Sequence, residues 1–241
     1  MRTQKAHAGP FAERLYVERH EIESMALDEL RKASLLPDAP APTRVERFIE
    51  KRFKVVPSYE DLPAGVLGFT RFGSNGVAEV VVSRSLSEEG TRAAERRVSS
   101  TLAHEVGHML LHGHLFALAH ATGTTRLLGD DVDGANRKIL CRDEAPSSRP
   151  PAPARRGYDG RWWEYQANMM IGPFLLPGPL VRRAIDAMLS AGGSLGIRTL
   201  APDRRDEAAA HLANVFDVNP AVARIRVDEL YPASPEGQLS L

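Results

Sequence analysis

The sequence of 241 residues has a single cysteine, Cys141, so no disulfide bond can form within the chain. It has no net charge, since 31 basic residues balance 31 acidic ones, which argues against a protein that coats nucleic acid or a membrane surface. No apolar run approaches the ~18 residues that a membrane span requires. The first ten residues lack the apolar core of a secretory signal. We therefore expect a cytoplasmic protein without a membrane partner.

The histidines of the chain are concentrated in one short segment. Hydrophobic residues make up 43% and charged residues 26%, which is enough apolar material for a globular core. Five of the eight histidines lie between residues 104 and 120. They are His104, His108, His112, His114 and His120. This window is the first place to look for a functional site.

Apolar periodicity and turn residues predict a mixed α+β fold. Helices are predicted over residues 11–35, 44–53, 91–112, 162–171, 180–189, 203–216 and 220–230. Strands are predicted over 66–72 and 77–83, joined by a hairpin turn at 73–76. These two strands would form a small antiparallel sheet.

The segment His104-Glu-Val-Gly-His108 has the spacing of a metal site on a helix. Residues four apart lie one above the other, so His104 and His108 can bind a single cation. Glu105 lies 100° around the helix, where it can accept a proton from a water whose pKa zinc lowers. The apolar residues fall on the opposite side, so we expect the histidine face to line a cleft. The alternative is a surface helix with scattered histidines.

Two histidines leave a zinc site short of one protein ligand. The segment Trp162-Trp-Glu-Tyr-Gln-Ala-Asn168 begins a second predicted helix and offers Glu164 as that ligand. Asn168 lies on the same side and could orient a ligating histidine. From spacing alone, Glu164 is equally well explained as a first-turn acid that stabilises the helix dipole.

These segments, together with Phe174-Leu-Leu-Pro177, resemble the ImmA/IrrE metallopeptidases, which are gluzincin-like enzymes. The resemblance covers roughly residues 44–230. It implies a zincin-like α+β fold and zinc held by His104, His108 and Glu164, with Glu105 as the general base. It also implies endopeptidase activity on a helix-turn-helix transcriptional repressor, in stress or mobile-element regulation. Mn²⁺ is compatible with the same ligands.

The resemblance suggests three parts: an N-terminal helix and linker (1–43), a metallopeptidase domain (44–191) and a C-terminal helical hairpin with a tail (192–241). Pro173 departs from the family pattern and should kink or end its helix. A long stretch, 113–160, is rich in proline and arginine in its second half, and we expect it to be a mobile insertion that could cover the cleft. An extended substrate would pair with the sheet edge at 77–83.

Three residues near the metal segments allow more specific expectations. Gly107 lies inside a predicted helix, so the helix that carries Glu164 should pack closely against it. His112 should be a helix-end histidine favoured by the dipole, with Gly113 as a left-handed cap. Cys141 could block or sense the site as a thiolate, but a buried thiol is the simpler expectation.

Two other classes of function remain open at this stage. Residues 203–230 have the outline of a DNA-reading helix-turn-helix in which Arg224 and Arg226 would reach phosphates. However, six acidic residues face four arginines there, so nucleic acid is not the expected partner. In these alternatives the metal site is structural, and the protein either binds DNA or binds a repressor without cutting it.

Overall fold

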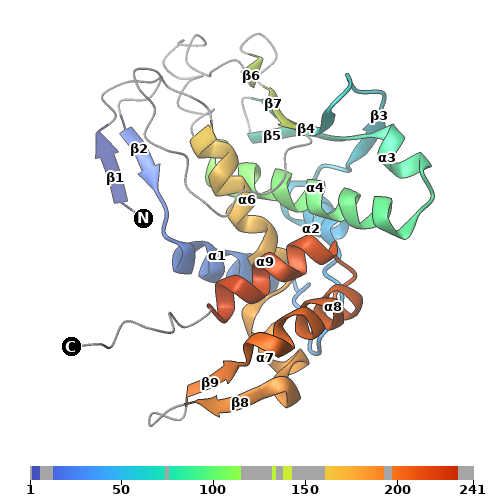
Figure 1. Cartoon of the computed structure of the whole chain (residues 1–241). Coiled ribbons are helices and arrows are strands. Elements are labelled where there is room, and N and C mark those ends of the chain that lie inside the picture. The colour runs from blue at the N-terminus through green and yellow to red at the C-terminus, as the bar shows by residue number, and fades with distance from the viewer. Residues whose placement is uncertain are drawn as a thin grey trace.

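The computed structural model describes residues 2–5, 13–73, 76–114, 132–133, 138–142, 161–192 and 197–232. It is a mixed α+β structure, as the sequence predicts. In Figure 1 a sheet lies on one side of the long helix α4, and most of the other helices lie on the opposite side. Within the described ranges, no helix is both long and apolar enough to cross a membrane.

The main sheet has five strands in the order β3-β5-β4-β7-β6. The predicted hairpin is confirmed, because β4 (Val66–Gly73) pairs antiparallel with β5 (Gly76–Ser83). The sheet also contains a parallel pair that the sequence did not predict, because β3 (Ser58–Glu60) pairs with β5 in parallel. Strand β4 separates β3 from β5 in the sequence. The connection from β3 to β5 is therefore long enough for the two strands to pair in parallel. A strand of three residues leaves no alternation to detect in the sequence.

The other edge of the sheet comes from the predicted insertion. Strand β7 (Lys138–Arg142) pairs antiparallel with β4, and β6 (Val132–Asp133) pairs with β7. Part of the 113–160 stretch therefore belongs to the sheet. The proline-rich part of this stretch lies outside the described residues.

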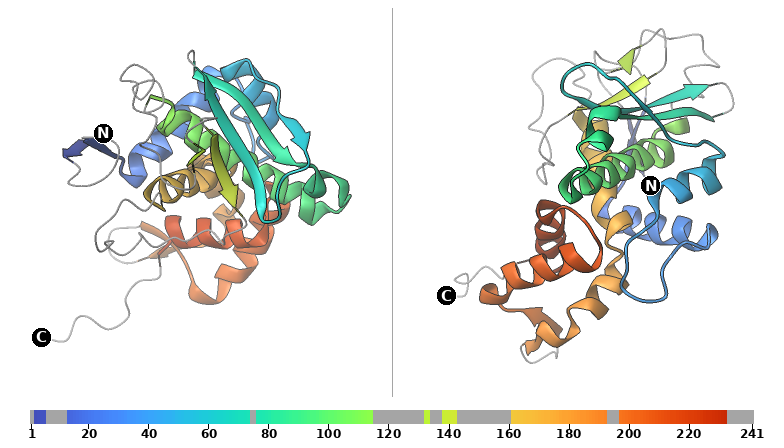
Figure 2. Two further views of the ribbon diagram at one scale, coloured as in Figure 1. Left: turned by 90° about the horizontal axis from the view of Figure 1, so that it is seen from above. Right: turned by 90° about the vertical axis from the view of Figure 1, so that its right-hand side faces the viewer.

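Two helices cross beneath the sheet. Helix α4 (Arg92–Leu111) begins where the side chain of Thr91 accepts a hydrogen bond from the Ala94 amide, as an N-cap does. Helix α6 (Arg161–Leu175) packs against α4, and Figure 2 shows the two helices in two further views. Pro173 lies in the last turn of α6, which ends two residues later, as its missing amide predicts.

The N-terminal segment contains a strand pair that the sequence analysis missed. Strand β1 (Arg2–Lys5) pairs with β2 (Glu13–Tyr16), so the helix predicted over 11–35 begins later, as α1 (Arg19–Lys32). Glu18 and Glu21 form a capping box that fixes this start. Helix α2 (Val45–Phe53) is confirmed within one residue of its prediction.

The C-terminal part contains three helices and a second strand pair. Helix α7 (Gly178–Ala184) ends earlier than predicted, because the chain enters a 3₁₀ turn (Asp186–Met188) and strand β8 (Leu189–Gly192). This strand pairs antiparallel with β9 (Ile197–Leu200). The boundary proposed between residues 191 and 192 therefore falls inside β8.

Helices α8 (Arg205–Val215) and α9 (Pro220–Leu230) follow a 3₁₀ turn (Pro202–Arg204) and pack against each other. Asn219 is the N-cap of α9, because its side chain accepts a hydrogen bond from the Ala221 amide. One continuous core joins the sheet, α4 and α6 to α1, α2, α7, α8 and α9, with helix α3 (Arg84–Glu88) at its margin. The histidines of α4 and Glu164 of α6 therefore lie on two helices that pack into the same core.

Candidate metal centre

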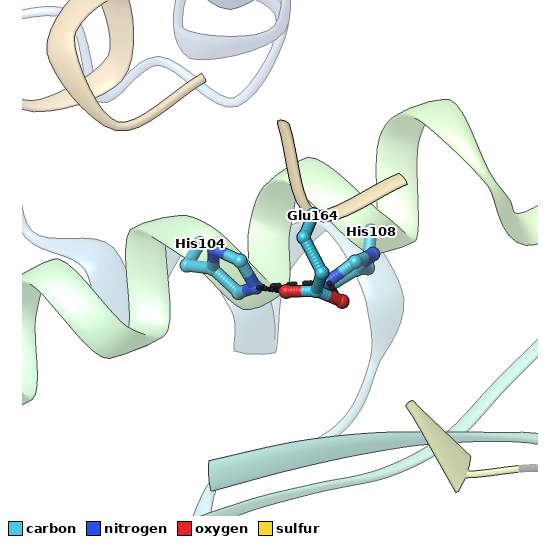
Figure 3. Close-up of side chains that lie close together, drawn as sticks. All are labelled: His104, His108 and Glu164. Carbon is cyan, nitrogen blue, oxygen red and sulfur yellow. Dashed lines mark hydrogen bonds and ion pairs between the residues drawn. The ribbon is translucent and has the colours of Figure 1, made fainter. Parts of the chain in front are cut away.

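Helix α4 aligns two imidazoles on one side, as the four-residue spacing predicts. The Nε2 atoms of His104 and His108 lie 2.9 Å apart. Helix α6 brings the third group, with Glu164 Oε2 3.0 Å from His104 Nε2 and Oε1 3.3 Å from His108 Nε2. Figure 3 shows the carboxylate directed at both rings. The structure thus brings together all three residues expected to hold a metal.

The spacing of these atoms fits a bound cation. Zinc ligands lie at ~2.0–2.1 Å from the metal, so neighbouring ligand atoms of a tetrahedral site are roughly 3.3 Å apart. The two imidazole–carboxylate distances, 3.0 and 3.3 Å, are close to that value. A histidine pair with a carboxylate is also a donor set that zinc accepts.

The tautomer of His104 gives a second reason to expect a cation. Its Nδ1 lies 2.9 Å from the side-chain oxygen Oδ1 of Asn168, so Nδ1 carries the proton and donates it. In the neutral ring, Nε2 then presents a lone pair toward the carboxylate of Glu164. Two acceptors at this distance repel each other unless a proton or a metal cation lies between them. This contact is consistent with the orienting role that the sequence predicts for Asn168.

Close packing of the two helices depends on Gly107. A Cβ atom at this position would lie 2.8 Å from Cα and 2.9 Å from the carbonyl oxygen of Ala167. Because both atoms belong to the backbone of α6, a side chain would force the helices apart. The predicted approach of the Glu164 helix to Gly107 is confirmed, and it sets the distance between the segments that carry His104, His108 and Glu164.

Glu105 lies on the side of α4 that faces the sheet. Its side chain is fully buried, and Oε2 accepts a hydrogen bond of 2.6 Å from the hydroxyl of Thr70 on β4. The other oxygen, Oε1, has no hydrogen-bond partner among the described residues. Burial raises the pKa of Glu105 to about 7, against the lowering effects of His104 and Thr70. A carboxylate with one oxygen held and one available is suited to proton transfer.

The backbone of β4 approaches α4 closely at Gly68, beside Glu105. A Cβ atom there would lie 2.8 Å from the Val81 carbonyl oxygen, 2.9 Å from Thr101 Cγ2 and 3.6 Å from Glu105 Oε1. A larger residue would therefore displace the β4 backbone or the helix below it. Thr70 and Gly68 are functional candidates that the sequence analysis missed, because β4 and α4 meet only in the tertiary structure.

The ionisation of the cluster suits metal binding. Burial alone would raise the pKa of Glu164, but His108 and His104 hold it well below its ordinary value. Burial lowers the pKa of His108, which favours the neutral ring that a metal requires. Glu164 is the most exposed member of the cluster, with 27% of its side chain accessible. Its side of the site is therefore the most open.

The prediction that the histidine face lines an open cleft needs correction. Thr101, His104, Glu105 and His108 are all at least 97% buried, so both sides of α4 are covered here. Helix α6 covers one side and strand β4 the other. Amphipathic spacing identified the polar side correctly, but it could not show that polar residues would themselves be packed.

His112 differs most from its expected role. It is fully buried at the end of α4, and burial lowers its pKa well below the ordinary value, so a helix-end cation is the wrong interpretation. Gly113 does not have the positive φ of a left-handed cap. Instead, His112 Nδ1 lies 2.9 Å from His108 Nδ1, and its Nε2 lies 3.2 Å from Gln166 Oε1.

The proposed substrate edge at 77–83 also needs correction. Strand β5 pairs with β4 on one side and, over Val81–Ser83, with β3 on the other. A substrate strand cannot pair with Val81–Ser83 without displacing β3, whereas β3 does not pair with residues 77–80. On the far side of β4, strand β7 pairs Cys141 with Gly68 along the backbone. The side chain of Cys141 lies outside the described residues.

The C-terminal helices do not present the phosphate-binding arginines that a DNA-reading pair needs. Arg226 is 1% exposed, and its guanidinium binds both carboxylate oxygens of Glu23 at 2.6 and 2.7 Å. It also donates to the carbonyl oxygen of Leu176. Arg224 is exposed and pairs with Asp206. The interpretation of Arg226 as a phosphate contact is therefore wrong, because this arginine binds α1 to α9.

No protein-family model matches the chain, and no curated protein matches it either. The metal centre is thus argued from its own geometry.

Proposed function

We propose that this chain is a zinc-dependent endopeptidase with a zincin-like fold, of the ImmA/IrrE type, that acts in the cytoplasm. The observation that carries the proposal is the convergence of His104, His108 and Glu164, with atoms 2.9–3.3 Å apart, beside the buried acid Glu105. A purely structural metal site would need a fourth protein ligand, whereas three leave a position open for chemistry. The described residues offer a cluster of three.

The reaction would be hydrolysis of a peptide bond. His104, His108 and Glu164 would hold a zinc ion, which would supply Lewis acidity to the scissile carbonyl and the attacking water. Glu105 accepts one proton from that water as its oxygen bonds to the carbonyl carbon. The carbon–nitrogen bond then breaks, and Glu105 returns the proton to the leaving amine. Thr70 holds Oε2 of Glu105, so Oε1 is the oxygen that takes part.

The substrate class comes from the family resemblance alone. A transcriptional repressor with a helix-turn-helix domain is the proposed protein partner. Zinc is the proposed metal, and Mn²⁺ is compatible with the same donors. Nucleic acid is not a proposed partner, since the buried position of Arg226 removes one of the two arginines that favoured it.

A peptide-library experiment tests the proposal. The zinc-loaded full chain and its Glu105→Gln variant are incubated with a library of unstructured peptides, and new termini are identified by mass spectrometry. We expect cleavage by the wild-type chain and a loss of about 10²–10⁴-fold in rate for the variant, the usual contribution of a general base. Both proteins should keep one zinc ion, because Glu105 is not a proposed ligand.

Two results would overturn the proposal. One is the absence of new termini with zinc-loaded wild-type chain at every peptide tested. The other is equal cleavage by Glu105→Gln, which would place the activity elsewhere or in a contaminant. If Glu105→Gln still inactivates a repressor in cells, a binding module without proteolysis becomes the better explanation.

A further inference from the structure

We propose that His112 and Gln166 form a hydrogen-bond chain that holds His108 in the tautomer whose Nε2 lone pair faces the metal. The proposal rests on the metal centre described above and assigns positioning roles to two residues outside the ligand set. The chain runs from Gln166 on α6, through His112 at the end of α4, to His108 one turn earlier.

The direction of each hydrogen bond follows from its end point. The side-chain oxygen Oε1 of Gln166 can only accept, so His112 Nε2 carries a proton and donates it over 3.2 Å. A neutral imidazole has one N–H group, which leaves a lone pair on His112 Nδ1. That lone pair accepts the proton of His108 Nδ1 over 2.9 Å. The Nε2 of His108 is then left unprotonated on the metal side.

Burial makes this assignment stringent. His108 and His112 are fully buried and Gln166 is 4% exposed, so water does not compete freely for these hydrogen bonds. The indole ring of Trp163 packs against His112, with ring centroids 4.8 Å apart, and limits rotation of the imidazole. If His112 took the opposite tautomer, the proton of His108 would move to Nε2, where a metal must bind.

The same short stretch of α6 controls both histidines. Glu164 supplies the carboxylate, Gln166 acts on His108 through His112, and Asn168 acts directly on His104. Residue 164 thus supplies one ligand oxygen of the proposed site. Residues 166 and 168 orient the Nε2 lone pairs of His108 and His104. Outer contacts of this kind typically change metal affinity by about 10–100-fold when they are removed.

The test measures zinc affinity and tautomers, neither of which requires peptidase activity. Zinc dissociation constants are measured by competition with a chromophoric chelator for wild type, His112→Leu, His112→Asn, Gln166→Leu and Gln166→Glu. We expect the two leucine variants to bind zinc about 10–100-fold more weakly. His112→Asn should recover most of the affinity, since an amide oxygen can take the place of ring Nδ1. Gln166→Glu should also retain affinity, since it keeps an acceptor oxygen.

His114→Leu is the matched control. His114 is also a histidine near the end of α4, but it is exposed and lies outside the chain of hydrogen bonds. The His114→Leu variant should therefore bind zinc as tightly as the wild-type chain. Thermal unfolding identifies variants that lose the fold instead of the tautomer. If His112→Leu does not fold, the wild-type NMR measurement described next decides the question by itself.

Nitrogen NMR of the wild-type chain reads the tautomers directly, with and without zinc. We expect protonated Nδ1 on His108 and protonated Nε2 on His112. A protonated Nε2 on His108, or unchanged zinc affinity in both leucine variants, would overturn the proposal. A chain that binds zinc with these tautomers but cuts no peptide would refute the proposed peptidase while leaving this inference intact.

Discussion

Thr70 and Glu105 are 35 residues apart in sequence, yet the threonine hydroxyl donates a hydrogen bond of 2.6 Å to the glutamate carboxylate, and both side chains are fully buried. This contact joins the sheet to the helix that carries the two histidines of the proposed metal centre. It selects which carboxylate oxygen stays available, because Oε1 has no partner among the described residues. The position of the proposed base thus depends on β4 as well as on α4.

Replacing Thr70 by valine should slow peptide cleavage without removing the metal. A hydrogen bond to a charged group contributes about 1.5–3 kcal/mol, so we expect kcat to fall by roughly 10–100-fold. Thr70→Ser keeps the hydroxyl and is the control, with a rate close to that of the wild-type chain. Equal rates for valine and serine variants would show that this hydrogen bond does not position the base.

The same variant should shift the pH dependence of cleavage. The Thr70 hydrogen bond favours the ionised carboxylate and lowers the pKa of Glu105, so its loss raises that pKa further. Because the base acts as a carboxylate, the acidic limb of the kcat/KM profile should move to higher pH in Thr70→Val. A shift to lower pH, or none, would contradict this assignment.

Gly107→Ala should destabilise the chain, although alanine is the better helix former by about 0.5–1 kcal/mol. The added methyl group would meet the backbone of Ala167 at 2.8–2.9 Å, and overpacking of this kind costs about 1–3 kcal/mol. Urea unfolding measures the change. Zinc affinity should fall too, since α6 carries Glu164. Adding Ala167→Gly should not rescue stability, because the clash is with backbone atoms.

Arg226→Met should destabilise the fold by about 3 kcal/mol, because it leaves Glu23 and Glu229 without their buried cation. Arg224→Met is the matched control on the same helix, and its exposed ion pair should contribute at most about 1 kcal/mol. Chemical unfolding distinguishes the two. Equal, small effects would show that the network around Arg226 does not stabilise the packing of α1 on α9.

Local patterns predicted those parts of the fold that depend on local interactions. The predicted helices over 91–112 and 220–230 agree with α4 and α9 within one residue at each end. The four-residue spacing of His104 and His108 fixed their alignment in the same way. Glu164 needed the family resemblance in addition, because spacing within one helix cannot show which other helix packs beside it.

Long-range contacts account for what the sequence could not predict. The parallel pairing of β3 and the addition of β7 to the sheet depend on strands of three and five residues, too short to show periodicity. The roles of Thr70 and His112 depend on contacts with side chains that local patterns do not place. Arg226 is a buried charge, which composition predicts to be exposed.

Metal removal should loosen the junction of α4 and α6. Without a cation, the lone pair of His104 faces the carboxylate of Glu164 at 3.0 Å. Chelation should therefore lower the melting temperature. Zinc present at 100 times its Kd would stabilise the fold by about 2.7 kcal/mol, and chelation removes this contribution. Differential scanning calorimetry with a chelator and after zinc is restored measures this. An unchanged melting temperature would mean that the cluster does not bind metal tightly.

The most direct measurement is the zinc stoichiometry and dissociation constant of the wild-type chain beside those of Glu164→Ala and Glu105→Gln. We predict one zinc ion per wild-type chain, zinc binding at least ~100-fold weaker in Glu164→Ala, and little change in Glu105→Gln. A wild-type chain that binds no zinc, or a Glu164→Ala variant that binds it as tightly, would contradict the proposed centre.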